Sequence, residues 1–178
     1  MLNKDGLRIA ISGKSGCGNT TVSKMVAEQL DLEFINYTFR SIAEEDGIPF
    51  EEVRRRAELS DEYDRRVDKT QVELASRAPS VLGSRLAVWM LENADLKIFL
   101  TGSPEVRAAR IHKREGGSIE EQIKITAERD ELDHKRYKRL YGIDNNNYSF
   151  VDLIINTDRL NAEQVAGIIV AAAKLIMK

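Results

Sequence analysis

The sequence contains a single cysteine, Cys17, and no long apolar run. One thiol excludes an intramolecular disulfide and favours a reducing compartment. The most apolar stretch, 165–177, is too short to span a bilayer and carries Lys174. Segment 1–12 lacks the apolar run of a signal peptide. We therefore expect a cytoplasmic protein with no membrane partner.

The sequence also lacks an excess of charge of either sign. It has 27 Lys and Arg against 29 Asp and Glu, a formal net charge of -2. Because a protein that binds nucleic acid through phosphates needs a basic field, we expect no nucleic-acid partner. The length of 178 residues and an apolar content of 42% suit one α/β domain with a sizeable core, which we assign to 1–178.

Five β-rich segments alternate with helical ones: 8–12, 33–36, 80–82, 96–101 and 153–156. The first, fourth and fifth are nearly continuous apolar runs, as in parallel strands covered on both faces. Helix starts are indicated by Ser103 before a proline, and by the capping-box spacings of Ser118 with Glu121 and Asn161 with Gln164. This alternation predicts a doubly wound parallel sheet.

Segment 37–78 differs from the rest because it is helical and highly charged, and it lies between the second and third strands. A helical insertion at this place can close over a ligand at the strand ends. The alternative is a set of solvated amphipathic helices without a role in binding. We favour the closing insertion because a phosphate-binding loop precedes it.

That loop is GKSGCGNTT, residues 13–21, between a strand and a helix. Gly13 and Gly18 stand where the pattern G-x-x-x-x-G-K-[ST] has its glycines, and Gly16 is additional. Glycines let backbone amides approach a phosphate, and the helix that follows adds its positive end. Thr20 stands at the hydroxyl position that ligates magnesium. The alternative is a purely structural glycine turn. We expect nucleotide binding by Gly13, Lys14, Ser15, Gly16, Cys17, Gly18, Asn19, Thr20 and Thr21.

The loop departs from the pattern at Asn19, which occupies the slot of the lysine that reaches the outer phosphates. An amide donates a hydrogen bond but brings no charge to the transition state. Lys14 is our candidate for the missing charge, and the alternative is a solvent-exposed loop lysine. We interpret Cys17 as a small loop residue.

With this loop and with the arginines of later segments, the chain resembles nucleoside monophosphate kinases. It most closely resembles the short cytidylate kinases of the archaeal type. The resemblance rests on YTFRSIAEEDGI, VLGSRLAVWML, ADLKIFL, VRAARIHKREGGS, ERDELDHKRY and YGID, in family order. It implies a three-layer P-loop NTPase fold with an NMP-binding insertion near 37–78 and a short lid near 110–136. It also implies ATP- and Mg2+-dependent phosphorylation of CMP and dCMP.

The same strings imply roles for individual residues. Arg40 would bind the monophosphate, and Arg85 would be the nucleotide-binding arginine. Arg129, Asp133 and Arg136 recur at i, i+4 and i+7, which places them on one face of a helix. There the arginines would hold phosphates and Asp133 would accept from a sugar hydroxyl. The alternative is an ion pair on a solvated helix. The predicted catalytic set is Lys14, Arg85, Arg129 and Arg136.

The predicted lid is short. Arg110 and Arg114 lead into the turn 115–117, and we expect both to contact ATP. Arg107, His112 and His134 are expected to lie on the surface. A zinc site is excluded because the only cysteine lies in the phosphate loop.

Gly83 stands where the related kinases have an acidic residue that helps to hold magnesium. Thr20, phosphates and water can still hold the ion. The loss of lysine and acid together favours a second hypothesis, a nucleotide-binding regulator with weak or no catalysis. A third is a kinase for another small acceptor such as a sugar acid, which leaves the face of Arg129, Asp133 and Arg136 unexplained. We expect a monomer.

Overall fold

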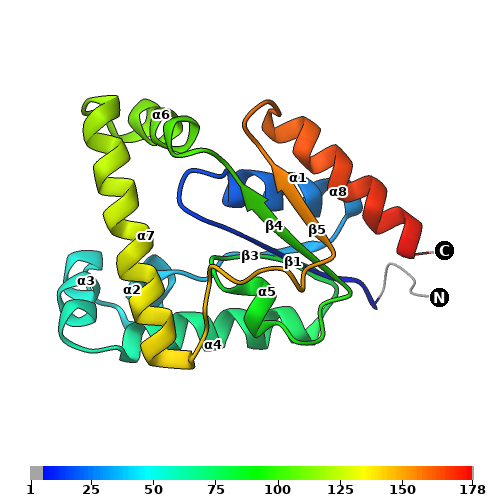
Figure 1. Cartoon of the computed structure of the whole chain (residues 1–178). Coiled ribbons are helices and arrows are strands. Elements are labelled where there is room, and N and C mark those ends of the chain that lie inside the picture. The colour runs from blue at the N-terminus through cyan, green and yellow to red at the C-terminus, as the bar shows by residue number, and fades with distance from the viewer. Residues whose placement is uncertain (1–5, 178) are drawn as a thin grey trace.

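The computed structural model describes residues 6–177, so residues 1–5 and 178 of the predicted domain lie outside it. Its centre is a five-stranded parallel sheet with the strand order β2-β3-β1-β4-β5 (Figure 1). The strands are β1 (Arg8–Gly13), β2 (Glu33–Ile35), β3 (Ser80–Gly83), β4 (Leu96–Thr101) and β5 (Leu153–Asn156). All five predicted strands form, and their ends differ from the prediction by at most one residue.

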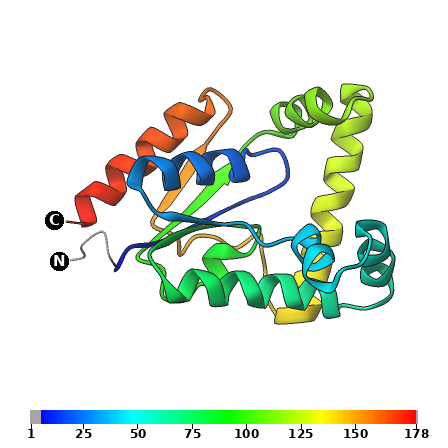
Figure 2. The same ribbon diagram turned by 180° about the vertical axis from the view of Figure 1, so that it is seen from behind.

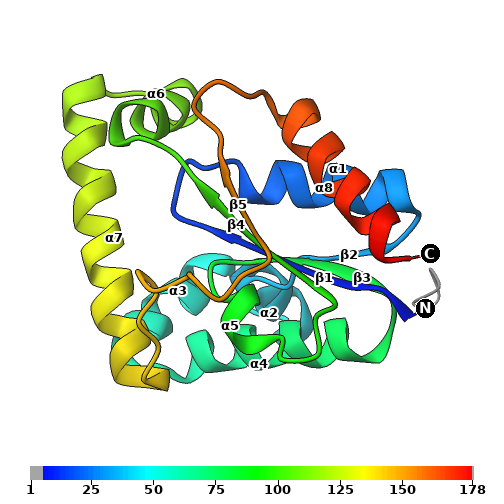
Figure 3. The same ribbon diagram turned by 45° about the vertical axis from the view of Figure 1, so that its right-hand side comes forward.

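Eight helices surround the sheet in residues 6–177. They are α1 (Asn19–Leu30), α2 (Phe39–Asp46), α3 (Phe50–Leu59), α4 (Glu62–Arg77), α5 (Ala87–Met90), α6 (Pro104–Glu115), α7 (Ile119–Tyr141) and α8 (Ala162–Ile176). Helices α1 and α8 cover one face, and α4 and α5 cover the other (Figures 1 and 3). The predicted three-layer P-loop NTPase fold is therefore confirmed.

The predicted helix starts are capped by side chains. Ser103 accepts from the Val106 amide, and Ser118 accepts from the Glu121 amide. Asn161 and Gln164 form the full reciprocal capping box at the start of α8. Each bond satisfies a first-turn amide that has no partner inside its own helix.

The central strand β1 is apolar on both sides because each side faces a helical layer. Ile9 and Ile11 pack in a cluster with residues of α1 and α8, including Val22. Ala10, between them, belongs to a second cluster with Leu82 and residues of α4 and α5. Alternating side chains point to opposite faces of a strand, so a strand buried on both faces has no polar side.

Two helical parts lie at the end of the sheet away from the carboxyl end of α8 (Figure 1). Segment 37–78 contains α2, α3 and α4 and has a small core of its own around Ile42 and Val53. Helices α6 and α7 are joined at Gly116 and Gly117, whose φ angles are 82° and 83°. Figure 2 shows α7 running from α6 to the helices of segment 37–78. In residues 6–177, no helix is both long and apolar enough to cross a membrane.

Candidate active site

The phosphate-binding loop connects β1 to α1. Gly16 and Gly18 have φ angles of 84° and 88°, a left-handed conformation that glycine adopts without strain. Gly18 is the N-cap of α1 and makes no side-chain hydrogen bond there. The first amides of α1 are therefore available to an anion at the positive end of the helix.

Two glycines of the loop are required by close packing. A Cβ on Gly13 would lie 2.9 Å from the carbonyl oxygen of Leu100 in β4. On Gly16 it would lie 2.7 Å from the carbonyl oxygen and 3.0 Å from the Cα of Arg107 in α6. The additional Gly16 thus lets α6 pack directly against the loop.

A cleft of about 620 Å³ lies over this loop at the carboxyl ends of the strands. All nine predicted loop residues, 13–21, line it. Among the described residues that line the cleft, none is acidic. Five are cationic: Lys14 of the loop, Arg85, Arg110, Arg114 and Arg129. A concave site of this charge attracts anions such as nucleotide phosphates.

Several polar residues of the cleft were missed by the sequence analysis. Asn36 and Thr38 follow β2, Ser84 follows β3 and Thr157 follows β5, while Gln71 comes from α4. Their position after strands is a signal that could have found the first four, because ligands of open α/β sheets bind outside the carboxyl ends of the strands. Gln71 carries no such signal. Its amide donates to the Tyr37 carbonyl oxygen at 2.7 Å.

The lid arginines are held at the cleft by different partners. Arg110 donates to the carbonyl oxygen of Thr157 at 2.6 Å and to its hydroxyl at 2.8 Å. Arg114 and Arg129 both pair with Glu115, at 2.5 and 3.4 Å. These arginines lower the pKa of the Glu115 carboxyl, Arg114 through its hydrogen bond most strongly. Arg110 is thus anchored to protein, whereas a phosphate would compete with Glu115 for the other two.

Three predicted substrate residues do not line this cleft. Arg40 is exposed, and its guanidinium carbon lies 4.4 Å from the centroid of the Phe50 ring. Asp133 and Arg136 line a separate hollow of about 400 Å³ beside α7. The shared helix face predicted for Arg129, Asp133 and Arg136 does not bring all three into one cleft.

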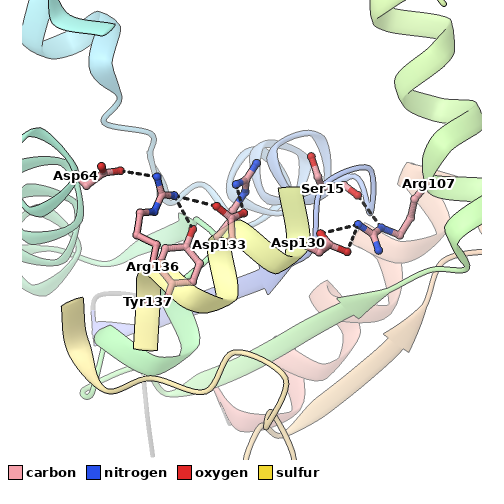
Figure 4. A network of polar contacts seen from close by, with 8 residues as sticks. Ser15, Asp64, Arg107, Asp130, Asp133, Arg136 and Tyr137 are labelled. Carbon is pink, nitrogen blue, oxygen red and sulfur yellow. Dashed lines mark hydrogen bonds and ion pairs between the residues drawn. The ribbon is translucent and has the colours of Figure 1, made fainter. Parts of the chain in front are cut away.

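Asp133 lies between two arginines (Figure 4). One carboxylate oxygen accepts from Arg85, and the other accepts from Arg136 at 2.9 Å. Arg136 also pairs with Asp64 of α4 at 3.1 Å. Each oxygen of Asp133 already accepts from one arginine, so a sugar hydroxyl would have to share the carboxylate with Arg85 and Arg136. The chain of contacts links Arg85 at the cleft to segment 37–78.

Arg107, expected on the surface, is buried, with 5% of its area exposed. Its Nε donates to the carbonyl oxygen of Ser15 at 2.7 Å, and its Nη2 contacts both oxygens of Asp130 at 2.9 and 2.8 Å (Figure 4). The prediction was wrong because α7 folds back over α6 and places Asp130 against this side chain. Arg107 therefore connects the phosphate-binding loop to α7.

The two histidines are only partly exposed, and neither lines the cleft. His134 is half-buried, and its Nδ1 lies 2.9 Å from Oδ1 of Asn145. His112 is also half-buried, in α6. Sequence position on charged helices indicated exposure, but both helices pack against other parts of the chain on the histidine side.

Burial shifts the pKa of several groups around the site. The pKa of Asp68 in α4 is raised to about 6, chiefly by burial, although a hydrogen bond from Tyr141 at 2.8 Å opposes the shift. Burial raises the pKa of Asp64 as well. It also raises the pKa of the Cys17 thiol, which makes this cysteine a poor nucleophile and agrees with its role as a small loop residue.

Comparisons with known proteins agree with this geometry. The model of the cytidylate kinase-like family matches residues 8–159. The chain is 48% identical over 167 residues to cytidylate kinase 2 of Borreliella afzelii (strain PKo), covering 92% of this chain and 94% of that relative. It is 47% identical over 171 residues to the cytidylate kinase of Pyrococcus horikoshii, covering 95% and 89%.

A solved structure supports the fold independently. The shikimate kinase of Bacteroides thetaiotaomicron superposes with a TM-score of 0.64 at 18% identity, over 94% of this chain and 98% of that one. At this identity the likeness concerns the fold alone. Together with the glycine loop and the family match, it shows that this chain is a P-loop kinase that belongs to the cytidylate kinase-like family.

Proposed function

We propose that the protein transfers the γ-phosphoryl group of ATP to CMP, giving ADP and CDP, and that it accepts dCMP in the same site. The supporting observation is the cleft in which a phosphate-binding loop faces five cationic side chains and no acidic one among its described lining residues. The cytidylate kinases to which the chain is similar support the choice of acceptor. An oxygen of the CMP phosphate attacks the γ-phosphorus, and the bond to the bridging oxygen of ADP breaks. No general base is needed because the acceptor is already ionised.

The donor end of the reaction is assigned to the loop and the lid. Backbone amides of residues 13–21 and the start of α1 bind the phosphates of ATP, and Lys14, Arg110 and Arg114 supply positive charge. Thr20 is exposed in the first turn of α1, and a hydroxyl is a suitable ligand for Mg2+. In residues 6–177 no cluster of three His, Cys, Asp or Glu side chains could hold a metal. Thr20 therefore fits a Mg2+ ion that would be completed by phosphate oxygens and water. When bound, this ion would neutralise phosphate charge.

The acceptor end is assigned to Arg85, Arg129 and segment 37–78. Arg85 and Arg129 line the cleft and would hold the CMP phosphate and the transferring group. Asp133 and Arg136 position Arg85 through the contacts described above. Arg40 reaches the cleft only when segment 37–78 moves toward the loop, a closure that also excludes water.

The test is a coupled assay that measures ADP production with ATP, Mg2+ and a panel of CMP, dCMP, UMP and AMP. We expect turnover with CMP and dCMP, and Arg129→Ala should lower kcat by about 100-fold or more. Arg159→Ala, an exposed arginine outside the cleft lining, is the matched control. No ADP from any acceptor would refute the proposal. Tight calorimetric binding of CMP and ATP without turnover would select the nucleotide-binding regulator instead.

We further propose that the protein acts in the cytoplasm as a monomer. ATP is available to a kinase in that compartment, and the buried free thiol of Cys17 suits its reducing conditions. Size-exclusion chromatography with light scattering tests the oligomeric state, and a stable dimer would contradict it.

A further inference from the structure

The residue in the lysine slot of the loop has a side-chain partner one helical turn later. Asn19, the first residue of α1, lines the cleft. Its Oδ1 accepts a hydrogen bond from the Oγ of Ser23 at 3.1 Å. Ser23 is fully buried, so no water reaches its hydroxyl.

Ser23 is held in place from the opposite side by a residue that has no side chain. A Cβ on Gly83, at the end of β3, would lie 2.6 Å from the Cβ of Ser23 and 3.4 Å from Cε2 of Phe34. Gly83 therefore leaves the space that Ser23 occupies. Since both β3 and the helical backbone are rigid, this packing fixes where the Ser23 hydroxyl lies.

The bond from Ser23 decides which end of the Asn19 carboxamide is free. Because the serine hydroxyl donates to Oδ1, Ser23 makes no hydrogen bond with the amide nitrogen of Asn19, and the two N–H donors of that nitrogen stay free to bind a ligand. We propose that Ser23 is a positioning residue that holds Asn19 with its amide nitrogen toward the phosphates of ATP. Asn19 then acts as an oriented neutral donor, and the charge comes from Lys14 and the cleft arginines. This inference rests on the proposed kinase function.

The hydrogen bond has a specific kinetic consequence. An oriented amide contributes to binding of ATP and to the transition state, whereas a freely rotating amide must first be ordered. Loss of the Ser23 hydroxyl should therefore weaken the use of ATP and leave the binding of CMP unchanged. A purely structural serine would change stability without this selectivity.

The experiment is a double-mutant cycle of Ser23→Ala and Asn19→Ala, with kcat and KM measured separately for ATP and CMP. We expect Ser23→Ala to lower kcat/KM for ATP by about tenfold. KM for CMP at saturating ATP should not change. In the Asn19→Ala background the effect of Ser23→Ala should disappear, because coupled residues are not additive. Asn19→Asp, which still accepts from Ser23 but has no N–H donor, should lose more than Asn19→Ala.

Ser80→Ala is the matched control. Ser80 is also fully buried, its hydroxyl donates to the carbonyl oxygen of Ala75, and it does not line the cleft. Its loss should leave KM for ATP unchanged. If Ser23→Ala fails to fold, Ser23→Cys, with a weak donor of similar shape, takes its place in the cycle.

The outcomes separate this inference from the proposed function. Additive effects, an equal change in KM for CMP, or kinetics of Ser23→Ala that match those of Ser80→Ala would overturn the positioning role. Failure of the unsubstituted protein to make CDP would refute the kinase function instead. In that case calorimetric titration with ATP on the same variants still tests whether Ser23 orients Asn19.

Discussion

The two halves of α7 are attached to the molecule in different ways. Near its middle, Asp130 pairs with Arg107, and their side chains are 17% and 7% exposed. Near its carboxyl end, Arg139 pairs with Asp61 of segment 37–78, and these side chains are 61% and 35% exposed. A buried pair must stay intact because an unpaired buried charge is costly, whereas an exposed pair contributes little. The attachment at the loop is thus rigid, whereas the Arg139–Asp61 pair adds little to the contacts of Arg136 with Asp64 and of Tyr141 with Asp68, which also join α7 to segment 37–78.

The largest effect should come from the buried attachment. Arg107→Ala leaves the Asp130 carboxylate and the Ser15 carbonyl oxygen without this partner, so we expect a loss of about 3–5 kcal/mol in the free energy of unfolding. Urea denaturation measures it. The double variant Arg107→Met with Asp130→Leu removes both charges and should recover part of the loss. If Arg107→Ala is as stable as the parent protein, the pair of Arg107 and Asp130 is not a rigid attachment.

The close packing of the loop against α6 gives the next largest effect. Gly16→Ala places a Cβ 2.7 Å from the Arg107 carbonyl oxygen at a φ of 84°, and such overpacking costs about 1–3 kcal/mol. Gly47→Ala is the control, because Gly47 has a φ of 64° but no atom within 4 Å of such a Cβ. Thermal unfolding should show the larger loss for Gly16, and calorimetry should show weaker ATP binding for that variant alone. Equal losses would mean that only backbone strain matters.

The attachment of α7 to α4 should depend on pH through Asp68. Its pKa in the folded protein is about 6, above the value of an unfolded aspartate, so the native state binds the proton more tightly. The stability of the protein should therefore fall through this residue as pH rises from about 4 to about 6. Asp68→Asn, which keeps an acceptor for Tyr141, should gain about 1–2 kcal/mol at pH 7 and lose this pH dependence. The free energy of unfolding is measured for the parent and for Asp68→Asn at pH 4 and at pH 7. If the two proteins differ by the same amount at both pH values, the prediction is wrong.

The smallest effect should come from the exposed pair. Arg139→Ala should leave the free energy of unfolding nearly unchanged, because both partners are solvated. The difference should shrink further at high salt. A loss as large as that of Arg107→Ala would remove the distinction between the two halves of α7.

The sequence by itself determined the elements and the phosphate-binding loop. Strand ends such as Arg8 and Asn156 were predicted to within one residue because buried parallel strands leave continuous apolar runs between polar boundaries. The caps at Ser103 and Asn161 followed from hydrogen bonds between residues three positions apart. These features are local, so their physics is contained in a short segment of chain.

Only the tertiary structure decided which side chains meet across the molecule. Gly16 faces Arg107, Gly83 faces Ser23, and Asp133 joins Arg85 to Arg136. The first two pairs depend on the space between segments distant in sequence, and the engagement of Asp133 depends on where α7 crosses the end of the sheet. Helical periodicity indicated a shared face but not its partners, because a partner is set by the packing of whole elements rather than by spacing along one helix.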